Sequence, residues 1–264
     1  MDKLDIIILA GQSNAAGTGT GEVTQPYARD ERILMMTDTS NPRFEGEGDQ
    51  VYLKLDLPAN HIVSVAEEPA EKNGNFALAF ATRYAQTYLE ADRKILIVNA
   101  AVGGTGFARP EWGVGKVLHN RLLGMVEQAL SYNPENRVVA FLWHQGEHDS
   151  FENASWDTQK RYAVHKANLT ATINDIYTHF GFTAVPFIAG GFCDEWYLEN
   201  KEACDAVLKA IRECCVQWGS FVETAGLLSN NQKTGNGDTI HFCKESLHIL
   251  GKKYFDAYAA IRDK

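Results

Sequence analysis

The sequence predicts a three-layer α/β/α fold, in which a parallel β-sheet lies between two layers of helices. The first observation is that several short apolar runs are continuous rather than alternating, as is typical of strands covered on both faces. The second is that the segments between them repeat their apolar residues every three or four positions, the period of an amphipathic helix. Such alternation favours a parallel sheet with helical crossovers. The 264 residues, 45% hydrophobic and 22% charged, suffice to bury a sizeable core.

The predicted elements follow one another along the chain. The strands are LDIIILA (4–10), KILIVNAA (94–101), RVVAFLW (137–143) and AVPFIAGGF (184–192). The helices are residues 76–91, 117–132, 157–180, 201–218 and 245–262. Residues 18–74 are rich in Gly, Asn, Asp and Pro, and only 33–36, 51–57 and 61–65 resemble strands, so we interpret this segment as a long excursion with one core strand and a hairpin. No convincing linker interrupts the pattern, which predicts a single domain over residues 1–264.

Composition argues against several classes of function. The net charge of −9, from 34 acidic and 25 basic residues without Lys or Arg clusters, argues against a nucleic-acid partner. No apolar stretch approaches the roughly 18 residues needed to span a bilayer, so no membrane association is expected. Residues 1–5 do not resemble a signal peptide, which predicts a cytoplasmic location, or a secreted or periplasmic one if a leader has been removed. The five cysteines lack CxxC spacing and are predicted to be reduced thiols. The oligomeric state cannot be inferred.

Polar stretches follow three predicted strands, and a fourth precedes the last helix. They are GQSN (11–14), VGGTG (102–106), HQGEHD (144–149) and GDTIHF (237–242). Parallel sheets place their chemistry at the carboxyl ends of the strands. We therefore expect all four stretches on one edge of the sheet.

Ser13 follows the first strand directly and is a candidate nucleophile. Acyl transfer by serine needs a base to take the hydroxyl proton and a carboxylate to orient that base. Asp238 and His241 offer both on one loop, where a single turn can bring the carboxylate near Nδ1 while Nε2 points into the cleft. The structural alternative is that Ser13 caps a helix, Asp238 caps a turn and His241 lies on the surface.

The second and third stretches are candidates for an oxyanion hole. The glycines of GGTG (103–106) expose backbone N–H groups, and Gln145 presents a side-chain amide that can donate to a developing negative oxygen. Alternatively, the glycines serve only a turn and Gln145 is bonded within a loop.

Together these motifs resemble a known family. The stretches LAGQSNAAG, NAAVGGTG with Trp112, WHQGEHD, and GDTIHF followed by LG and Tyr254 are similar to the carbohydrate esterases that include sialate O-acetylesterases and acetylxylan esterases, a branch of the SGNH hydrolases. The motifs occur in the family's order from residue 7 to residue 254 and so cover nearly the whole chain. The resemblance implies a flavodoxin-like sandwich, no metal or other cofactor, and an acetylated carbohydrate as substrate.

The resemblance also implies a role for each motif residue. The triad would be Ser13 as nucleophile, His241 as base and Asp238 as the acid that orients it. The oxyanion donors would be the backbone N–H groups of Ser13 and Gly104 and the side chain of Gln145. The supporting residues would be Gln12 and Asn14, which fix the turn around Ser13, and Glu147, which braces the site.

The chain departs from the family pattern at two of these motifs. Ala15 stands where methionine is usual, and His148 and Asp149 follow the Gly-Glu pair where a small polar residue is common. His148 either lines the pocket or, as we favour, lies on the surface. Trp112 and Trp156 either stack on a sugar ring or anchor the core.

Other functions match parts of the sequence. His144 to His148 fits the inverted zinc-protease motif H-x-x-E-H, but that motif needs both histidines on one helix, and a strand and Gly146 argue against it. The glycines of GTGTG (17–21) could cradle phosphate, although they lack GxGxxG spacing and a P-loop lysine, and a loop flanking the site is favoured. A carbohydrate-binding protein that has lost catalysis is a third alternative. The G-x-S-x-G elbow of an α/β-hydrolase does not fit, because Ala15 takes its last position.

The sequence therefore predicts a serine esterase that removes acetyl groups from a carbohydrate. It leaves the identity of the sugar open.

Overall fold

The computed structural model describes residues 2–68, 74–109 and 111–264. Within them, a seven-stranded sheet has the order β5-β2-β6-β1-β7-β8-β9. Its strands are β1 Lys3–Gly11, β2 Ile33–Asp38, β5 His61–Val65, β6 Arg93–Asn99, β7 Arg137–His144, β8 Phe187–Gly190 and β9 Gly219–Val222. All neighbouring strands pair in parallel except β5, which is antiparallel to β2 at the edge. The predicted parallel sheet is confirmed, except for this antiparallel edge strand.

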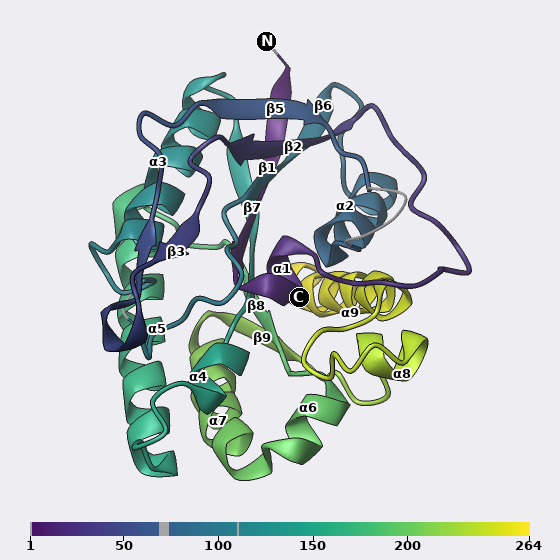
Figure 1. Ribbon diagram of the computed structural model, residues 1–264. Helices are drawn as coiled ribbons and strands as arrows, with labels where there is room; N and C mark the ends of the chain where they lie inside the picture. The colour runs from purple at the N-terminus through teal and green to yellow at the C-terminus, as the bar shows by residue number, and fades with distance from the viewer. Residues whose placement is uncertain (1, 69–73, 110) are drawn as a thin grey trace.

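Helices connect the strands and cover the sheet on both sides. They are α1 Ser13–Ala16, α2 Phe76–Thr87, α3 Val117–Ser131, α4 Glu147–Phe151, α5 Thr158–Phe180, α6 Asp194–Glu199, α7 Lys201–Trp218, α8 Asn230–Thr234 and α9 Lys244–Arg262, with a 3-10 turn at Gly48–Gln50. Figure 1 shows α3, α5 and α7 on one side of the sheet and α2 and α9 on the other. This is the predicted α/β/α arrangement. Among the described helices, none has both the length and the hydropathy that crossing a bilayer needs.

The central strand β1 explains why its apolar run is continuous. Ile6 and Ile8 pack in the core beneath α3, α5 and α7, whereas Ile7 and Leu9 pack in the core beneath α2 and α9. All four side chains are completely buried. Burial of each such side chain stabilises the fold by about 1.5–3 kcal/mol, so both faces of β1 contribute to stability.

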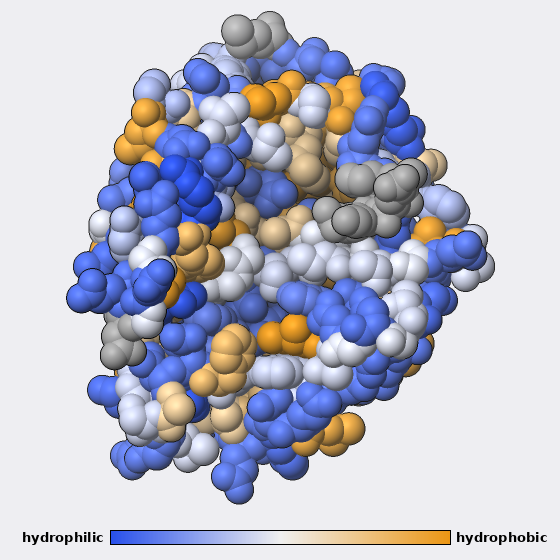
Figure 2. Space-filling model, viewed as in Figure 1, coloured by the Kyte–Doolittle hydropathy of each residue, from blue (hydrophilic) through white to orange (hydrophobic). Residues whose placement is uncertain are grey.

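The predicted excursion contributes two strands to the core sheet rather than one, because β5 pairs with β2 at the edge. β2 joins the core sheet beside β6, and a separate hairpin is formed by β3, Arg43–Glu45, and β4, Tyr52–Lys54. Residues 69–73, which belong to this segment, lie outside the described residues. The face of the molecule seen in Figure 2 is mainly hydrophilic, with apolar side chains in small separate patches.

The three central strands are joined near their amino ends by a buried carboxylate. Asp5 of β1 accepts hydrogen bonds from Arg93 Nε and Arg137 Nε, each at 2.7 Å, and from the Tyr84 hydroxyl at 2.7 Å. Burial opposes ionisation of Asp5, but these donors outweigh it and hold the pKa of the carboxyl below its usual value. The cluster lies at the opposite end of β1 from Ser13.

Candidate active site

Ser13 lies where β1 ends beside β7. Gly11 pairs with His144 in the parallel register, and Gln12 N donates to the His144 carbonyl oxygen at 2.9 Å. Gly11 has a φ of +128°, and a Cβ on it would lie 2.1 Å from that carbonyl oxygen. Only glycine allows this close approach, because any other side chain would collide with backbone. The chain then turns into α1, whose first residue is Ser13.

The structure brings Ser13, His241 and Asp238 together across 228 residues of sequence. His241 Nε2 lies 2.9 Å from Ser13 Oγ, and His241 Nδ1 lies 2.9 Å from both carboxylate oxygens of Asp238. The side chains of His241 and Asp238 are 25% and 28% exposed, so a substrate can reach the imidazole. This arrangement can move a proton from the hydroxyl to the imidazole while the carboxylate fixes the tautomer.

Asp238 has a second partner that the sequence did not indicate. Asn230 Nδ2 donates to Asp238 Oδ2 at 2.9 Å. Burial opposes ionisation of Asp238, but the hydrogen bonds from Asn230 and His241 outweigh it and keep the pKa of the carboxyl below its usual value. The only local signal near Asn230 is a capping box between Ser229 and Gln232, which marks the start of α8 and carries no information about Asp238.

Within the part of the chain that the structure describes, the backbone N–H groups of Ser13 and of Gly104, in the loop after β6, are free to donate. The loop after β6 passes so close that a Cβ on Gly103 would lie 3.5 Å from Ser13 Cβ. Among the described residues, no acceptor is hydrogen-bonded to the N–H of Ser13 or of Gly104. Donors that are unpaired next to a nucleophile are what an oxyanion hole requires.

Asp149, one of the departures from the family pattern, anchors this loop. Its carboxylate accepts from Phe107 N at 2.9 Å and Ala108 N at 2.8 Å, and His165 Nδ1 lies 2.9 Å from it. Although burial opposes ionisation, these contacts keep the pKa of Asp149 below its usual value. A buried carboxylate therefore holds the segment that follows Gly104.

Gln145 is buried in a network rather than pointing freely into solvent. Its Nε2 lies 3.1 Å from Asp149 Oδ2 and 3.3 Å from both Gln12 Oε1 and the Thr105 carbonyl oxygen. Three acceptors thus surround two N–H groups. Its oxyanion role stays a prediction, and it requires one of these contacts to be released. Gln12 Oε1 also accepts from His148 N at 3.1 Å, so Gln12 ties the Ser13 turn to α4.

Asn14 and Glu147 connect the nucleophile turn to the loop that carries His241. Asn14 Nδ2 donates to Glu147 Oε1 at 2.7 Å and to the Ile240 carbonyl oxygen at 3.2 Å, and its Oδ1 accepts from Phe242 N at 3.1 Å. The two residues that flank His241 are therefore held by one side chain. Glu147 is completely buried, and contacts with His144 and Asn14 outweigh its burial and hold the pKa of its carboxyl below the usual value.

Comparison with known proteins gives the family of the chain. The model of the family described as "Carbohydrate esterase, sialic acid-specific acetylesterase" matches residues 3–260. The chain belongs to this family of carbohydrate esterases. No curated protein matches the chain significantly.

Solved structures related to this esterase share its fold. The structure of NanS has a TM-score of 0.75 at 18% identity and covers 100% of this chain and 99% of its own. An Arabidopsis thaliana protein has a TM-score of 0.71 at 20% identity, with 98% and 99% covered. A protein from Xanthomonas citri described as a carbohydrate acetylesterase has a TM-score of 0.64 at 13% identity, with 97% and 56% covered. At these identities the likeness supports the α/β/α fold alone.

Two predictions about the residues around the site of this esterase need correction. Trp112 is completely buried, its Nε1 donates to Thr105 Oγ1 at 2.9 Å, and its ring packs on Trp143. It anchors the core, and stacking on a sugar is excluded. His148 is only 5% exposed, because it lies in the first turn of the buried helix α4, so our preference for a surface position was wrong. Trp156 is partly buried, and its substrate role stays a prediction.

The stretch from His144 to His148 does not have the geometry of the inverted zinc-protease motif. His144 is the last residue of β7 and His148 lies in α4, with Gly146 between them at a φ of +141°. His144 Nδ1 lies 2.9 Å from the Tyr254 hydroxyl, whereas His148 Nε2 lies 3.3 Å from Glu152. The histidines therefore do not share a helical face. Over residues 2–68, 74–109 and 111–264, no group of three or more His, Cys, Asp or Glu side chains could hold a metal ion.

The GTGTG loop contacts the site from one side. Gly19 forms a backbone bridge with Gly74, and Thr20 N donates to Asn230 Oδ1 at 2.8 Å. These contacts agree with a loop that flanks the site.

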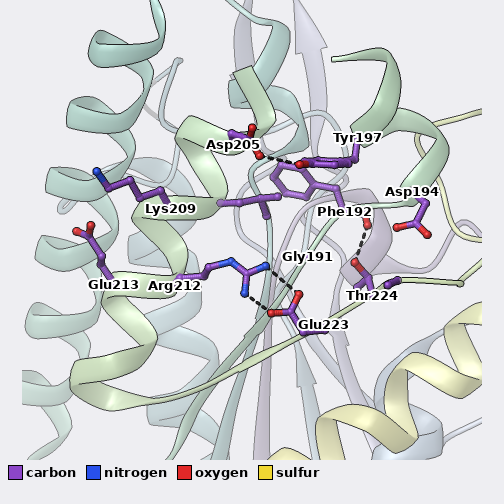
Figure 3. Close-up of a pocket in the computed structure, with 12 residues that line it drawn as sticks. Gly191, Phe192, Asp194, Tyr197, Asp205, Lys209, Arg212, Glu213, Glu223 and Thr224 are labelled. Atoms are coloured by element: carbon purple, nitrogen blue, oxygen red, sulfur yellow. Dashed lines mark hydrogen bonds and ion pairs between the residues drawn. The ribbon is translucent and has the colours of Figure 1, made fainter. Parts of the chain in front are cut away.

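A hollow of about 410 Å³ beside α6 and α7 does not include the triad (Figure 3). Two of the pairs that line it are hydrogen-bonded to each other: Arg212 Nη2 donates to Glu223 at 2.8 Å, and the Tyr197 hydroxyl donates to Asp205 at 2.8 Å. We assign no substrate to it.

Proposed function

We propose that this carbohydrate esterase is a serine esterase that removes O-acetyl groups through an acyl-enzyme intermediate. The observation that carries the proposal is the contact of 2.9 Å between His241 Nε2 and Ser13 Oγ, with Asp238 on the other ring nitrogen. Hydrogen bonding between a serine, a histidine and a carboxylate in this order is the arrangement that activates a hydroxyl for attack on an ester.

In the acylation step, Ser13 Oγ attacks the carbonyl carbon of the acetyl ester and His241 Nε2 takes the hydroxyl proton. The ester oxygen of the sugar leaves with that proton as the free sugar hydroxyl, and the acetyl group remains on Ser13. Asp238 stabilises the imidazolium during the transfer. In the deacylation step, a water molecule gives its proton to His241 and attacks the acetyl carbon. Acetate is released and the proton returns to Ser13 Oγ.

The negative oxygen that develops in both steps would be bound by the N–H groups of Ser13 and Gly104. Gln145 would add a third donor if its amide gave up a contact with Thr105 or Gln12. Removal of one such donor costs roughly 10²–10³ in kcat for enzymes of this kind.

The substrate class that we propose is an O-acetylated carbohydrate. The family description names sialic acid, and a related structure is described as a carbohydrate acetylesterase. Both descriptions support a sugar that carries an acetyl ester. Sialate and acetylxylan remain to be separated by a panel of acetylated sugars.

Substitution of the nucleophile tests this function. The Ser13→Ala variant should lose p-nitrophenyl acetate hydrolysis by at least about 10³-fold, because acyl-enzyme formation has no other nucleophile. Circular dichroism should remain that of the wild type, since the lost hydroxyl makes no core contact. Turnover by Ser13→Ala at the wild-type rate would refute the proposal.

Two controls separate the alternatives. Treatment of the wild type with a chelator should leave its turnover unchanged, whereas a zinc hydrolase would lose activity. A wild type that binds acetylated sugars without any turnover would instead support a carbohydrate-binding protein.

A further inference from the structure

We infer that Asn230 is a positioning residue of the triad: it fixes the Asp238 carboxylate against His241 and ties it to the loop that follows Ser13. The inference deepens the proposed function and rests on it. Asn230 is 1% exposed, so it cannot touch a substrate directly.

Every polar atom of the Asn230 side chain is used. Its Nδ2 donates to Asp238 Oδ2 at 2.9 Å and to the Thr18 carbonyl oxygen at 3.0 Å. Its Oδ1 accepts from Thr20 N at 2.8 Å and from Thr20 Oγ1 at 2.9 Å. The backbone N–H of Asn230 donates to the His241 carbonyl oxygen at 2.8 Å. One residue thus joins α8, the loop after the nucleophile and the loop with the acid and the base.

The carboxylate of Asp238 needs such a partner because its other contacts are local. His241 contributes a ring nitrogen at 2.9 Å from each oxygen and a backbone N–H at 3.2 Å from Oδ1. Asn230, in α8, supplies the hydrogen bond to this carboxylate that comes from another element. Without it, a side chain that is 28% exposed could rotate toward water and leave Nδ1 unsupported.

The amide is the chemically suitable group at this position. Nδ2 supplies two N–H groups to two oxygens, so an aspartate at position 230 would set a carboxylate oxygen against both the Asp238 carboxylate and the Thr18 carbonyl oxygen. Its other oxygen would still accept from Thr20. Asn230→Asp therefore removes the contact with Asp238 while it keeps the size and shape of the side chain.

The experiment measures kcat and KM for p-nitrophenyl acetate, together with Tm, in Asn230→Asp and Asn230→Ala. We expect kcat to fall roughly 10- to 100-fold, as for a misplaced catalytic group, with KM within about twofold of the wild type. The matched control is Asn136→Ala. Asn136 likewise uses both polar atoms of its side chain: it accepts from Leu4 N and donates to the Ala129 carbonyl oxygen, each at 2.8 Å, at the opposite end of β1. Its kcat should equal that of the wild type.

A double-mutant cycle distinguishes positioning from a general structural role. If Asn230 acts through Asp238, Asn230→Asp should cause no further loss of kcat in an Asp238→Asn background. Additive losses would overturn the inference, as would a wild-type kcat in Asn230→Asp, or loss of folding in both Asn230 variants. A wild type without Ser13-dependent turnover would instead reject the proposed function itself.

Discussion

Gly11 shows how a single residue determines the position of the nucleophile. The β1 backbone approaches the His144 carbonyl oxygen so closely that a Cβ would lie 2.1 Å from it, at a φ that favours glycine. The parallel register of Gly11 with His144 also sets Ser13 next to the residues that follow β7. The close approach of two strands, rather than flexibility, explains why glycine separates the apolar run from the polar one.

Substitution of Gly11 is therefore expected to be costly. Gly11→Ala should lower the free energy of unfolding by at least about 2 kcal/mol, because the strained φ and the backbone collision add to each other. Urea denaturation measures this change. The matched control is Gly124→Ala in α3, where a Cβ would meet nothing within 4 Å. Alanine should raise stability there by about 0.5–1 kcal/mol. Equal effects of the two substitutions would contradict our account of Gly11.

At the scale of elements, strong local signals predicted the long helices α2, α3, α5, α7 and α9 and the strands β1, β6, β7 and β8. The predicted helix over 157–180 corresponds to α5. Its bounds follow from its caps, since Asp157 accepts from Lys160 N at 2.7 Å at the start and Gly181 adopts the left-handed conformation at the end. The strand β9 was not predicted, because Gly219–Val222 is only four residues long and has no apolar run of its own. It forms because β8 offers a parallel partner, which is a tertiary effect.

The candidate site was predictable where chemistry is tied to short motifs. Ser13, Asp238 and His241 stand in such motifs, and the structure brings them into contact. Asn230 could not be found, since its contact with Thr18 joins residues 212 positions apart and no pattern records it. Trp112 was ambiguous because a tryptophan in the sequence looks the same whether it anchors the core or stacks on a sugar ring. Burial alone decided between them.

The Asp5 cluster that joins β1, β6 and β7 leads to a prediction about stability. Asp5→Asn should lower the free energy of unfolding by about 3 kcal/mol, since it leaves the buried Arg93 guanidinium without its charged partner. The matched control is Asp256→Asn, which removes an ion pair with Arg83 at 3.2 Å on the surface. That change should cost less than about 1 kcal/mol. Similar losses in the two variants, measured by urea denaturation, would show that Asp5 is not a special link.

At the scale of the whole molecule, the topology explains how distant segments meet. β1 lies between β6 and β7, so the loops that follow these three strands share the carboxyl edge of the sheet. The last segment reaches the same edge because the Asp238–His241 loop precedes α9, which packs with α2 on one face. Strand order therefore brings the Ser13 turn to this edge and the packing of α9 brings His241 there, while Asn14 links the two through its contacts with Glu147, Ile240 and Phe242.

These buried carboxylates also predict how the stability of the molecule depends on pH. Asp5, Glu147 and Asp149 each have a pKa below the usual value in the folded state. A carboxyl of this kind binds protons more weakly in the folded than in the unfolded chain, so the unfolded state gains protons first as the pH falls. The stability that the three groups contribute is fully present above about pH 5 and is lost progressively below about pH 4. Glu111 acts in the opposite direction, since burial raises its pKa, but it is one group against three.

Urea denaturation at about pH 6 and about pH 3.5 tests this dependence, because the free energy of unfolding should be lower at the more acid value. In Asp5→Asn the difference between the two pH values should be smaller than in the wild type, since one of the three groups no longer titrates. Asp256→Asn, whose carboxyl lies on the surface, should keep nearly the wild-type difference. If the free energy of unfolding stayed constant or increased on acidification, protonation of the buried carboxylates would not destabilise the fold, which would contradict this prediction. If the difference between the two pH values were unchanged in Asp5→Asn, Asp5 would not be one of the groups that control stability in acid.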